Sequence, residues 1–266
     1  MDQWLDYVPE IKSLRESDAF EIYLTAVRPE VEGWTTHHGL DPDLLTEIEW
    51  LRAQDALHDA VDGFTFGVSI DEAPGDGVQK ALACLEGTGS KPLMHVPSVG
   101  MYWSTKHNYT LSEDEEITRT AETVFLARSR RDICFVIDNF VEIDRGYCVC
   151  QGLVDRFYNP KSGSRVVTGL NALMPPDLTI THRYETNTHI LLVGENTSYR
   201  ATLICRRFND AKAATPNVDT DTFFDSAGIC TSLTTGDQQE TTLRELLENK
   251  ESQSGAAPRF FIQQKR

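Results

Sequence analysis

Short apolar runs alternate with helical patterns four times between Phe20 and Met174, and this alternation constrains the fold more than any other feature of the sequence. The runs are rich in aromatic and β-branched residues, which favours strands, and apolar residues at helical spacing follow each of them. The predicted strands cover residues 20–27, 61–70, 91–97 and 133–137. Strands that alternate with helices pair in parallel, so the sequence predicts an α/β domain with four βα units.

Helix start signals fall between the predicted strands. Asp41 and Pro42 have the residue types of an N-cap and a first helical position, and Ser112 with Glu115 forms a capping-box pattern. Two further helices are predicted from apolar residues at helical spacing around residues 78–85 and 166–173. Each helix therefore connects one predicted strand to the next element along the chain.

The carboxyl ends of the four strands are followed by ionisable side chains. Parallel strands in this order bring all four ends to the same side of the sheet, where α/β proteins place their chemistry. Ionisable groups are so dense after the fourth strand that they must either be solvated or take part in binding or catalysis. The candidate site residues are Arg28, Glu30, Asp71, Glu72, His95, Asp138, Asn139, Glu142, Asp144, Arg145 and Tyr147.

Each candidate also has an ordinary structural role. Arg28 and Glu30 can pair with each other, and Asp71 with Glu72 can cap the next helix. His95 can be a hydrogen-bonded interior histidine, and an aromatic residue such as Tyr147 packs in cores as well as on sugar rings. The prediction is a cleft lined by part of this set.

The pattern changes after the Pro175-Pro176 pair. Residues 177–184, 188–195 and 198–207 are β-rich, and a polar connection over 209–222 leads to a short helical pattern at 242–250 and a last strand at 259–263. Alternation of polar and apolar residues is typical of antiparallel sheets. We therefore expect a βα domain over residues 1–175 and a small antiparallel β-sandwich over residues 176–266.

Composition excludes several classes of partner. The 41 acidic and 25 basic residues give a formal charge of −16, which argues against nucleic acid and anionic membrane surfaces. No apolar run has the length of a membrane span and the first residues lack the pattern of a signal peptide, so a cytoplasmic location is expected. The six cysteines have neither disulfide-framework nor zinc-ribbon spacing.

The segment that closes the fourth unit resembles a known family. DRGY at 144–147, GLVD at 152–155 and the Asn-Pro pair at 159–160 lie between a strand ending in acidic residues and a helix ending in LNALM. This order is similar to the closing strand and helix of carbohydrate-active (β/α)₈ barrels that continue into a C-terminal β-sandwich, in particular the D-apionate lactonase type. The resemblance implies a TIM-barrel-like first domain and a small-molecule carbohydrate or sugar-lactone substrate.

Two departures from that family bear on the prediction. A full barrel has eight βα units, whereas four are found here. The chain is then a truncated barrel, an open sheet, or half of an assembly that a second copy or another chain completes. In addition, the third strand carries His95 where many glycosidases of this type carry a glutamate on the corresponding strand.

The expected activity is hydrolysis of a sugar lactone or glycoside by carboxylate-activated water. Asp138 or Glu142 would be the base, and His95 with Arg28 would act as acid or oxyanion partner, while the other candidates bind substrate. Asp71, His95 and Asp138 are acceptable metal ligands by type, but no ligand spacing or nucleotide motif indicates a metal or a cofactor. The alternative is a non-catalytic sugar-binding or subunit-interaction protein derived from a truncated barrel enzyme.

Overall fold

The computed structural model describes residues 3–15, 21–25, 53–68, 73–96, 112–137, 140–141, 152–186, 188–207, 222–248 and 257–265. Two compact units make up the chain. Unit 1 comprises residues 1–108 and 131–138, and unit 2 comprises residues 109–130 and 139–266. Unit 2 thus includes two helices that lie before residue 175, and the predicted boundary at that residue stays a prediction.

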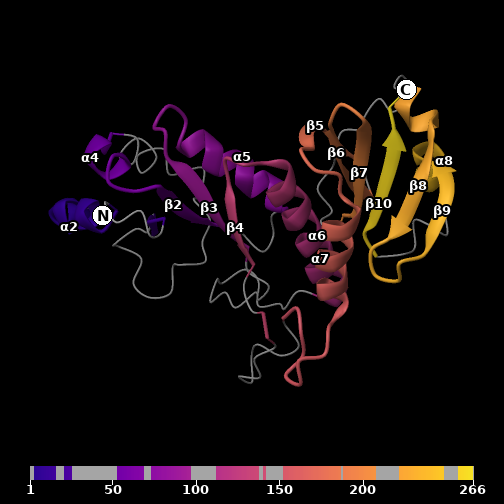
Figure 1. The fold of residues 1–266 in the computed structure, drawn as a ribbon, viewed down its shortest axis with the longest axis horizontal. Helices are drawn as coiled ribbons and strands as arrows, with labels where there is room; N and C mark the ends of the chain where they lie inside the picture. Colours follow the sequence, from indigo (N-terminus) through magenta and orange to yellow (C-terminus); the bar gives the residue numbers. More distant parts are fainter. Residues whose placement is uncertain are drawn as a thin grey trace. The chain divides into compact units, whose positions relative to one another are not determined.

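Unit 1 contains the predicted parallel sheet. Its strands are β1 (Tyr23–Thr25), β2 (Gly63–Gly67), β3 (Lys91–Val96) and β4 (Cys134–Ile137), and its helices are α1 (Gln3–Asp6), α2 (Val8–Arg15), α4 (Asp55–His58) and α5 (Pro74–Cys84). The strands pair in the order β1-β2-β3-β4, all in parallel. Figure 1 shows β2, β3 and β4 side by side. The predicted parallel pairing of the four strands is confirmed.

The two faces of this sheet differ. Phe64, Phe66 and Met94 lie on one face and are at most 3% exposed. On the other face Thr65 and Leu93 are half-buried, and Val136 is 43% exposed. The first face is therefore a hydrophobic core, and the second is open to solvent.

Tyr23 crosses the open face of the sheet. Its hydroxyl lies 3.2 Å from the Cys134 sulfur, although β1 and β4 are separated by two other strands. In a flat sheet these strands would lie about 14 Å apart, and side chains that stand perpendicular to the sheet would not meet. The Tyr23 ring lies across the sheet, and β1 and β4 are closer together than in a flat sheet, so the sheet is curved with Tyr23 and Cys134 on its concave side.

Gly63 makes room for this crossing. A Cβ atom at this position would lie 1.8 Å from the Lys91 carbonyl oxygen and 2.8 Å from the Tyr23 ring. Only glycine permits such a close approach of ring and backbone. Gly63 in β2 therefore allows the curvature, together with Tyr23 and Cys134.

Unit 2 contains a six-stranded antiparallel sheet. Its strands are β5 (Thr179–Glu185), β6 (His189–Glu195), β7 (Tyr199–Arg206), β8 (Ala227–Ser232), β9 (Gln238–Thr242) and β10 (Arg259–Gln264). They pair in the order β5-β6-β7-β10-β8-β9. The helices of the unit are α6 (Glu113–Ser129), α7 (Ser162–Leu173), η3 (Thr222–Asp225) and α8 (Leu243–Glu248).

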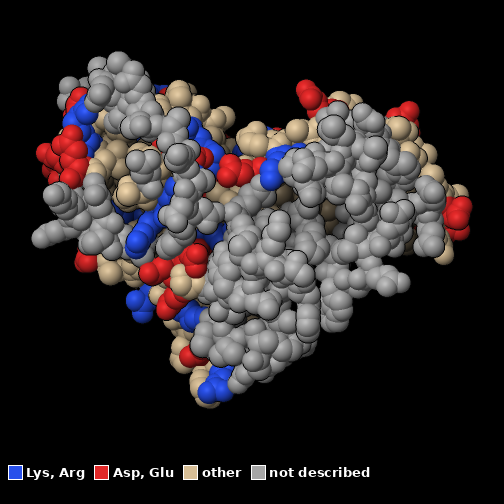
Figure 2. All heavy atoms as spheres, turned by 180° about the vertical axis from the view of Figure 1, so that it is seen from behind, with Lys and Arg blue, Asp and Glu red and all other residues tan. Residues whose placement is uncertain are grey.

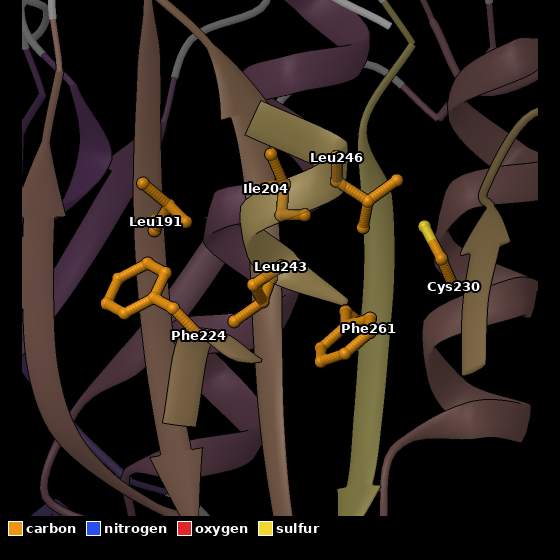
Figure 3. Packing of buried hydrophobic residues seen from close by; sticks show 7 residues of the cluster. All are labelled: Leu191, Ile204, Phe224, Cys230, Leu243, Leu246 and Phe261. Carbon is orange, nitrogen blue, oxygen red and sulfur yellow. The ribbon is translucent and has the colours of Figure 1, made fainter. Parts of the chain in front are cut away.

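The expected β-sandwich is wrong in one respect, because the described strands of unit 2 form a single sheet. β6 does not alternate, since every residue from His189 to Gly194 is buried. Both of its faces therefore need an apolar cover, and helices supply it. On one face η3 and α8 cover the strands in a core of Leu191, Ile204, Phe224, Cys230, Leu243, Leu246 and Phe261 (Figure 3).

Helix α6 covers the other face of the sheet. A Cβ atom on Gly194 would lie 3.4 Å from the Phe125 ring, and the Cys205 thiol lies 3.9 Å from the Thr118 carbonyl oxygen. Phe125 is fully buried, and α7 runs alongside α6 (Figure 1). Unit 2 is thus a sheet between helices.

Local signals predicted the helices α5, α6, α7 and α8, whereas α1, α2, α4 and η3 were not predicted. The capping box predicted at Ser112 and Glu115 is present and begins α6. Strands β8 and β9 were not predicted, because AGICTS and QQETT have little apolar alternation. β8 joins the sheet by pairing with β10, and β9 by pairing with β8. The predicted helix after Asp41 lies outside the described residues, and so does the connection over residues 209–221.

Figure 2 shows Lys and Arg side chains interspersed with Asp and Glu over the described surface of one face, rather than gathered into a basic area. Within the described residues, no helix combines the length and apolar character that crossing a membrane requires.

We expect Gly228→Ala to destabilise unit 2. The new Cβ would lie 2.5 Å from the Ile262 carbonyl oxygen and 2.6 Å from the Phe261 ring, which cannot both move away. The free energy of unfolding should fall by about 1–3 kcal/mol, the usual cost of overpacking. Thermal melting monitored by circular dichroism measures this change.

Gly169→Ala is the matched control. Gly169 lies inside α7, and an added Cβ would make an ordinary 3.4 Å contact with Leu233. Because alanine favours a helix, this variant should melt at or slightly above the wild-type temperature. Equal melting of Gly228→Ala and the wild type would contradict the packing described for β8.

Candidate active site

The carboxyl-terminal edge of the parallel sheet is the predicted site. The register pairs His95 with both Gly67 and Val136, and it pairs Val96 with Ile137, so β2, β3 and β4 end side by side. The segments that follow these strands, and the one after β1, therefore start at one edge. This is the arrangement that the sequence analysis predicted.

The individual candidates remain predictions. The backbone of His95 lies in β3, while its side chain lies outside the described residues. The other candidates lie wholly outside them, namely Arg28, Glu30, Asp71, Glu72, Asp138, Asn139, Glu142, Asp144, Arg145 and Tyr147. What the structure settles is the common edge from which their segments leave the sheet.

The opposite edge holds a polar cluster. Tyr23 donates a hydrogen bond of 2.8 Å to Glu21 and contacts Cys134. Burial, and then the hydrogen bonds with Cys134 and Glu21, raise the pKa of the Tyr23 hydroxyl. All three residues lie at the amino-terminal ends of β1 and β4, where barrels carry stabilising rather than catalytic groups.

A serine and a histidine also meet near this opposite edge. The His58 Nδ1 atom lies 2.7 Å from the Ser90 hydroxyl, and the ring packs edge-on against Phe64 at 5.1 Å. Such a pair can serve nucleophilic catalysis when an oxyanion site adjoins it. His58 precedes β2 and Ser90 precedes β3, so the pair lies away from the predicted site and ties α4 to the sheet.

The GLVD motif is anchored by α6. Glu116 accepts a hydrogen bond of 3.2 Å from the Gly152 backbone, which has a φ of 143° that favours glycine. The Glu116 carboxylate is buried, so this donor offsets part of its desolvation. Val154 forms short bridges with Val141 and Pro160. The motif thus has a structural function, which the resemblance did not specify.

Asp155 organises the turn that follows. One carboxylate oxygen accepts hydrogen bonds from the Phe157 and Asn159 backbone, and the other accepts one from the Asn159 side chain, all at 2.8 Å. These bonds, those from Asn159 first, lower the pKa of Asp155. The Tyr158 backbone has a φ of 65°, a conformation that this network holds.

The turn presents two aromatic rings to solvent. Phe157 is 72% exposed and Tyr158 is 71% exposed, and the Arg156 guanidinium lies 5.2 Å from the centre of the Phe157 ring. Large aromatic rings held in water on an ordered turn are typical of a contact surface. The sequence analysis did not select them, although two aromatics between an Asp and an Asn-Pro pair are a recognisable signal.

The part of the chain that the structure describes was searched for clusters of metal-ligating side chains. No three His, Cys, Asp or Glu side chains gather there in an arrangement that could hold an ion. Cys84 and Cys205 are buried as packing residues, and burial strongly raises the pKa of the Cys205 thiol. The predicted Asp71, His95 and Asp138 combination falls outside this region.

Comparison with solved structures gives low similarity to carbohydrate-active enzymes. A GH30 endoxylanase from Clostridium papyrosolvens C71 has 7% identity and a TM-score of 0.46, over 99% of this chain and 72% of the enzyme. The cyclomaltodextrin glucanotransferase CldA has 10% identity and a TM-score of 0.37, over 82% and 54%. A noncanonic maltogenic α-amylase, AmyB from Thermotoga neapolitana, has 8% identity and a TM-score of 0.29, over 85% and 64%.

No known family profile and no curated protein sequence matches the chain. Because the three TM-scores are below 0.5, the fold is described from the strand order and register of this chain and not from these enzymes.

We expect the Asp155 turn to loosen in acid. Because its pKa is lowered in the folded protein, the carboxylate stabilises the turn fully above the ordinary Asp pKa. This stabilisation is lost as the pH falls through the lowered value. In an NMR titration, the amide signals of Phe157 and Asn159 should shift together with a midpoint below the ordinary Asp value.

Asp155→Asn should abolish this titration, because the amide group does not ionise. Asp59→Asn removes an exposed carboxylate elsewhere and should leave the titration of the Phe157 and Asn159 amide signals unchanged. A midpoint at or above the ordinary Asp pKa in the wild type would contradict the hydrogen-bond network.

Proposed function

We propose that this chain is a carbohydrate-directed hydrolase that opens a sugar lactone or cleaves a glycoside with carboxylate-activated water. The observation that carries the proposal is the parallel order β1-β2-β3-β4, which starts four polar segments from one edge of a curved sheet. A curved parallel sheet with ionisable groups at its carboxyl edge is the arrangement that barrel enzymes use. The resemblance of the GLVD region supplies the substrate class.

In the proposed mechanism Asp138 or Glu142 removes a proton from water. The resulting nucleophile attacks the lactone carbonyl or the sugar carbon. His95 and Arg28 stabilise the developing oxyanion or protonate the leaving oxygen. Hydroxyl groups of the sugar would be bound by Glu30, Asp71, Glu72, Asn139, Asp144 and Arg145, with Tyr147 against the ring.

This mechanism requires neither a metal nor an organic cofactor. A carboxylate base and cationic or hydrogen-bonding partners suffice for the hydrolysis of an activated carbonyl. The third strand has a histidine where a glycosidase of the resembled type has a glutamate. That difference favours lactone opening over glycoside cleavage, since the latter needs two suitably spaced carboxylates.

Asp138→Asn and Glu142→Gln test the base. A panel of sugar lactones and aryl glycosides is first used to find a substrate of the wild type. Replacing the true base should then lower kcat by roughly 10²–10⁴-fold, with a smaller change in KM. Circular dichroism confirms that each variant is folded.

Asp59→Asn and Glu86→Gln are matched controls, because both carboxylates are exposed and precede strands at the other edge of the sheet. They should retain wild-type turnover. Full activity of both Asp138→Asn and Glu142→Gln would reject the proposed base, and absence of turnover with every substrate would reject the activity.

Sugar binding without catalysis is the second candidate, and the exposed rings of Phe157 and Tyr158 favour it. Aromatic faces stack against the apolar faces of sugar rings. In binding assays with an oligosaccharide panel, the Phe157→Ala, Tyr158→Ala double variant should bind about tenfold more weakly. Tyr7→Ala removes another exposed ring and should bind as the wild type does. Unchanged affinity of the double variant would exclude this platform.

A further inference from the structure

A short backbone ladder is formed next to the two candidate bases, Asp138 and Glu142. The Val154 N–H donates a hydrogen bond of 3.0 Å to the Phe140 carbonyl oxygen, and Val141 forms a parallel bridge with Val154. Asp138 precedes Phe140 by two residues, and Glu142 follows Val141 directly. Consecutive Cα atoms lie about 3.8 Å apart, so the Cα atoms of both candidates lie within roughly 8 Å of this ladder whatever their conformation. The position of Val154 therefore limits the positions of both.

The backbone around Val154 is itself held in place. Val154 forms an antiparallel bridge with Pro160, and the Lys161 N–H donates a hydrogen bond of 3.0 Å to the Leu153 carbonyl oxygen. The Val154 side chain is buried. Val154 is thus paired on one side with the segment that follows it in the chain, and on the other side with the segment between the candidate bases.

Helix α6 determines where the segment of Val154 begins. The Gly152 N–H donates a hydrogen bond of 3.2 Å to Glu116 Oε1, and Glu116 is buried. The helix is fixed in turn, because a capping box holds its first turn and Phe125 packs, fully buried, against Gly194 of the antiparallel sheet. A hydrogen bond is directional, so a buried acceptor fixes the Gly152 amide more narrowly than apolar packing would. Glu116 therefore attaches the ladder to the helix.

We propose that Glu116 is a positioning residue for the hydrolysis. It holds Gly152, and through Val154 it holds the backbone from which Asp138 and Glu142 project. The role rests on the proposed function, in which one of these two carboxylates is the base. Glu116 acts through the ladder and not on the substrate. A displacement of about 1 Å at a reacting group lowers the rate by up to roughly 10²-fold, even when the altered residue is far from the chemistry.

Steady-state kinetics of Glu116→Leu and Glu116→Gln test the role with a substrate of the wild type. Leucine removes the acceptor, so kcat should fall by roughly 10–100-fold, with a smaller change in KM because the groups that bind the sugar are unaltered. Glutamine keeps an oxygen that accepts the Gly152 N–H, so this variant should retain most of the wild-type turnover.

Thr123→Val is the matched control on the same helix. The Thr123 hydroxyl is buried and has no hydrogen-bond partner in the described part of the chain, so this variant should have wild-type kcat. Wild-type kcat in Glu116→Leu would overturn the proposal. So would a loss in Glu116→Gln or Thr123→Val that equals the loss in Glu116→Leu.

Amide hydrogen exchange gives a readout that needs no substrate. In the unaltered protein the Gly152 and Val154 amides should both be protected, because both donate hydrogen bonds. In Glu116→Leu they should exchange about tenfold faster or more, while the amides of β7 keep their protection. Rapid exchange of either amide in the unaltered protein, or unchanged exchange in Glu116→Leu, would overturn the proposal. Faster exchange in Glu116→Leu, together with no turnover of any substrate by the wild type, would instead reject the proposed function and leave the attachment of the ladder to Glu116 standing.

Discussion

The contact of Tyr23 with Cys134 determines the shape of the parallel sheet. It joins the first strand to the fourth across the concave side, and the missing side chain of Gly63 leaves room for the ring between them. The sheet has one buried face and one partly exposed face. Its candidate site follows from the parallel order and register, which end β2, β3 and β4 at a common edge.

Unit 2 obeys a different constraint. Its central strand β6 is buried on both faces, so covers are needed on two sides, and helices provide both. Helix α6 has a second function, since its Glu116 fixes the GLVD segment that leads to the Asp155 turn. The turn then holds Phe157 and Tyr158 in solvent, which is the strongest indication of a contact surface in the described part of this unit.

Local and periodic signals in the sequence predicted the parallel strands and the helices α5, α6, α7 and α8, because caps and apolar spacing act within a few residues. The number of sheets in the second half was not predictable, because a continuous apolar run such as β6 is compatible with a second sheet or with helices as its cover. Strands β8 and β9 were missed because they depend on pairing, β8 with β10 and β9 with β8, rather than on their own pattern. For the site, the sequence predicted the edge at which the candidate segments begin. The arrangement of Arg28, His95, Asp138 and the other candidates depends on tertiary contacts that no local pattern specifies.

The most direct test of this account is an NMR measurement of the proximity of Tyr23 and Cys134 in protein with labelled tyrosine and cysteine side chains. A curved sheet predicts a nuclear Overhauser effect between the Tyr23 ring protons and the Cys134 β protons, because the hydroxyl and sulfur atoms lie 3.2 Å apart. A spectrum in which Tyr23 shows contacts to β2 but none to Cys134 would contradict the curvature described for the parallel sheet.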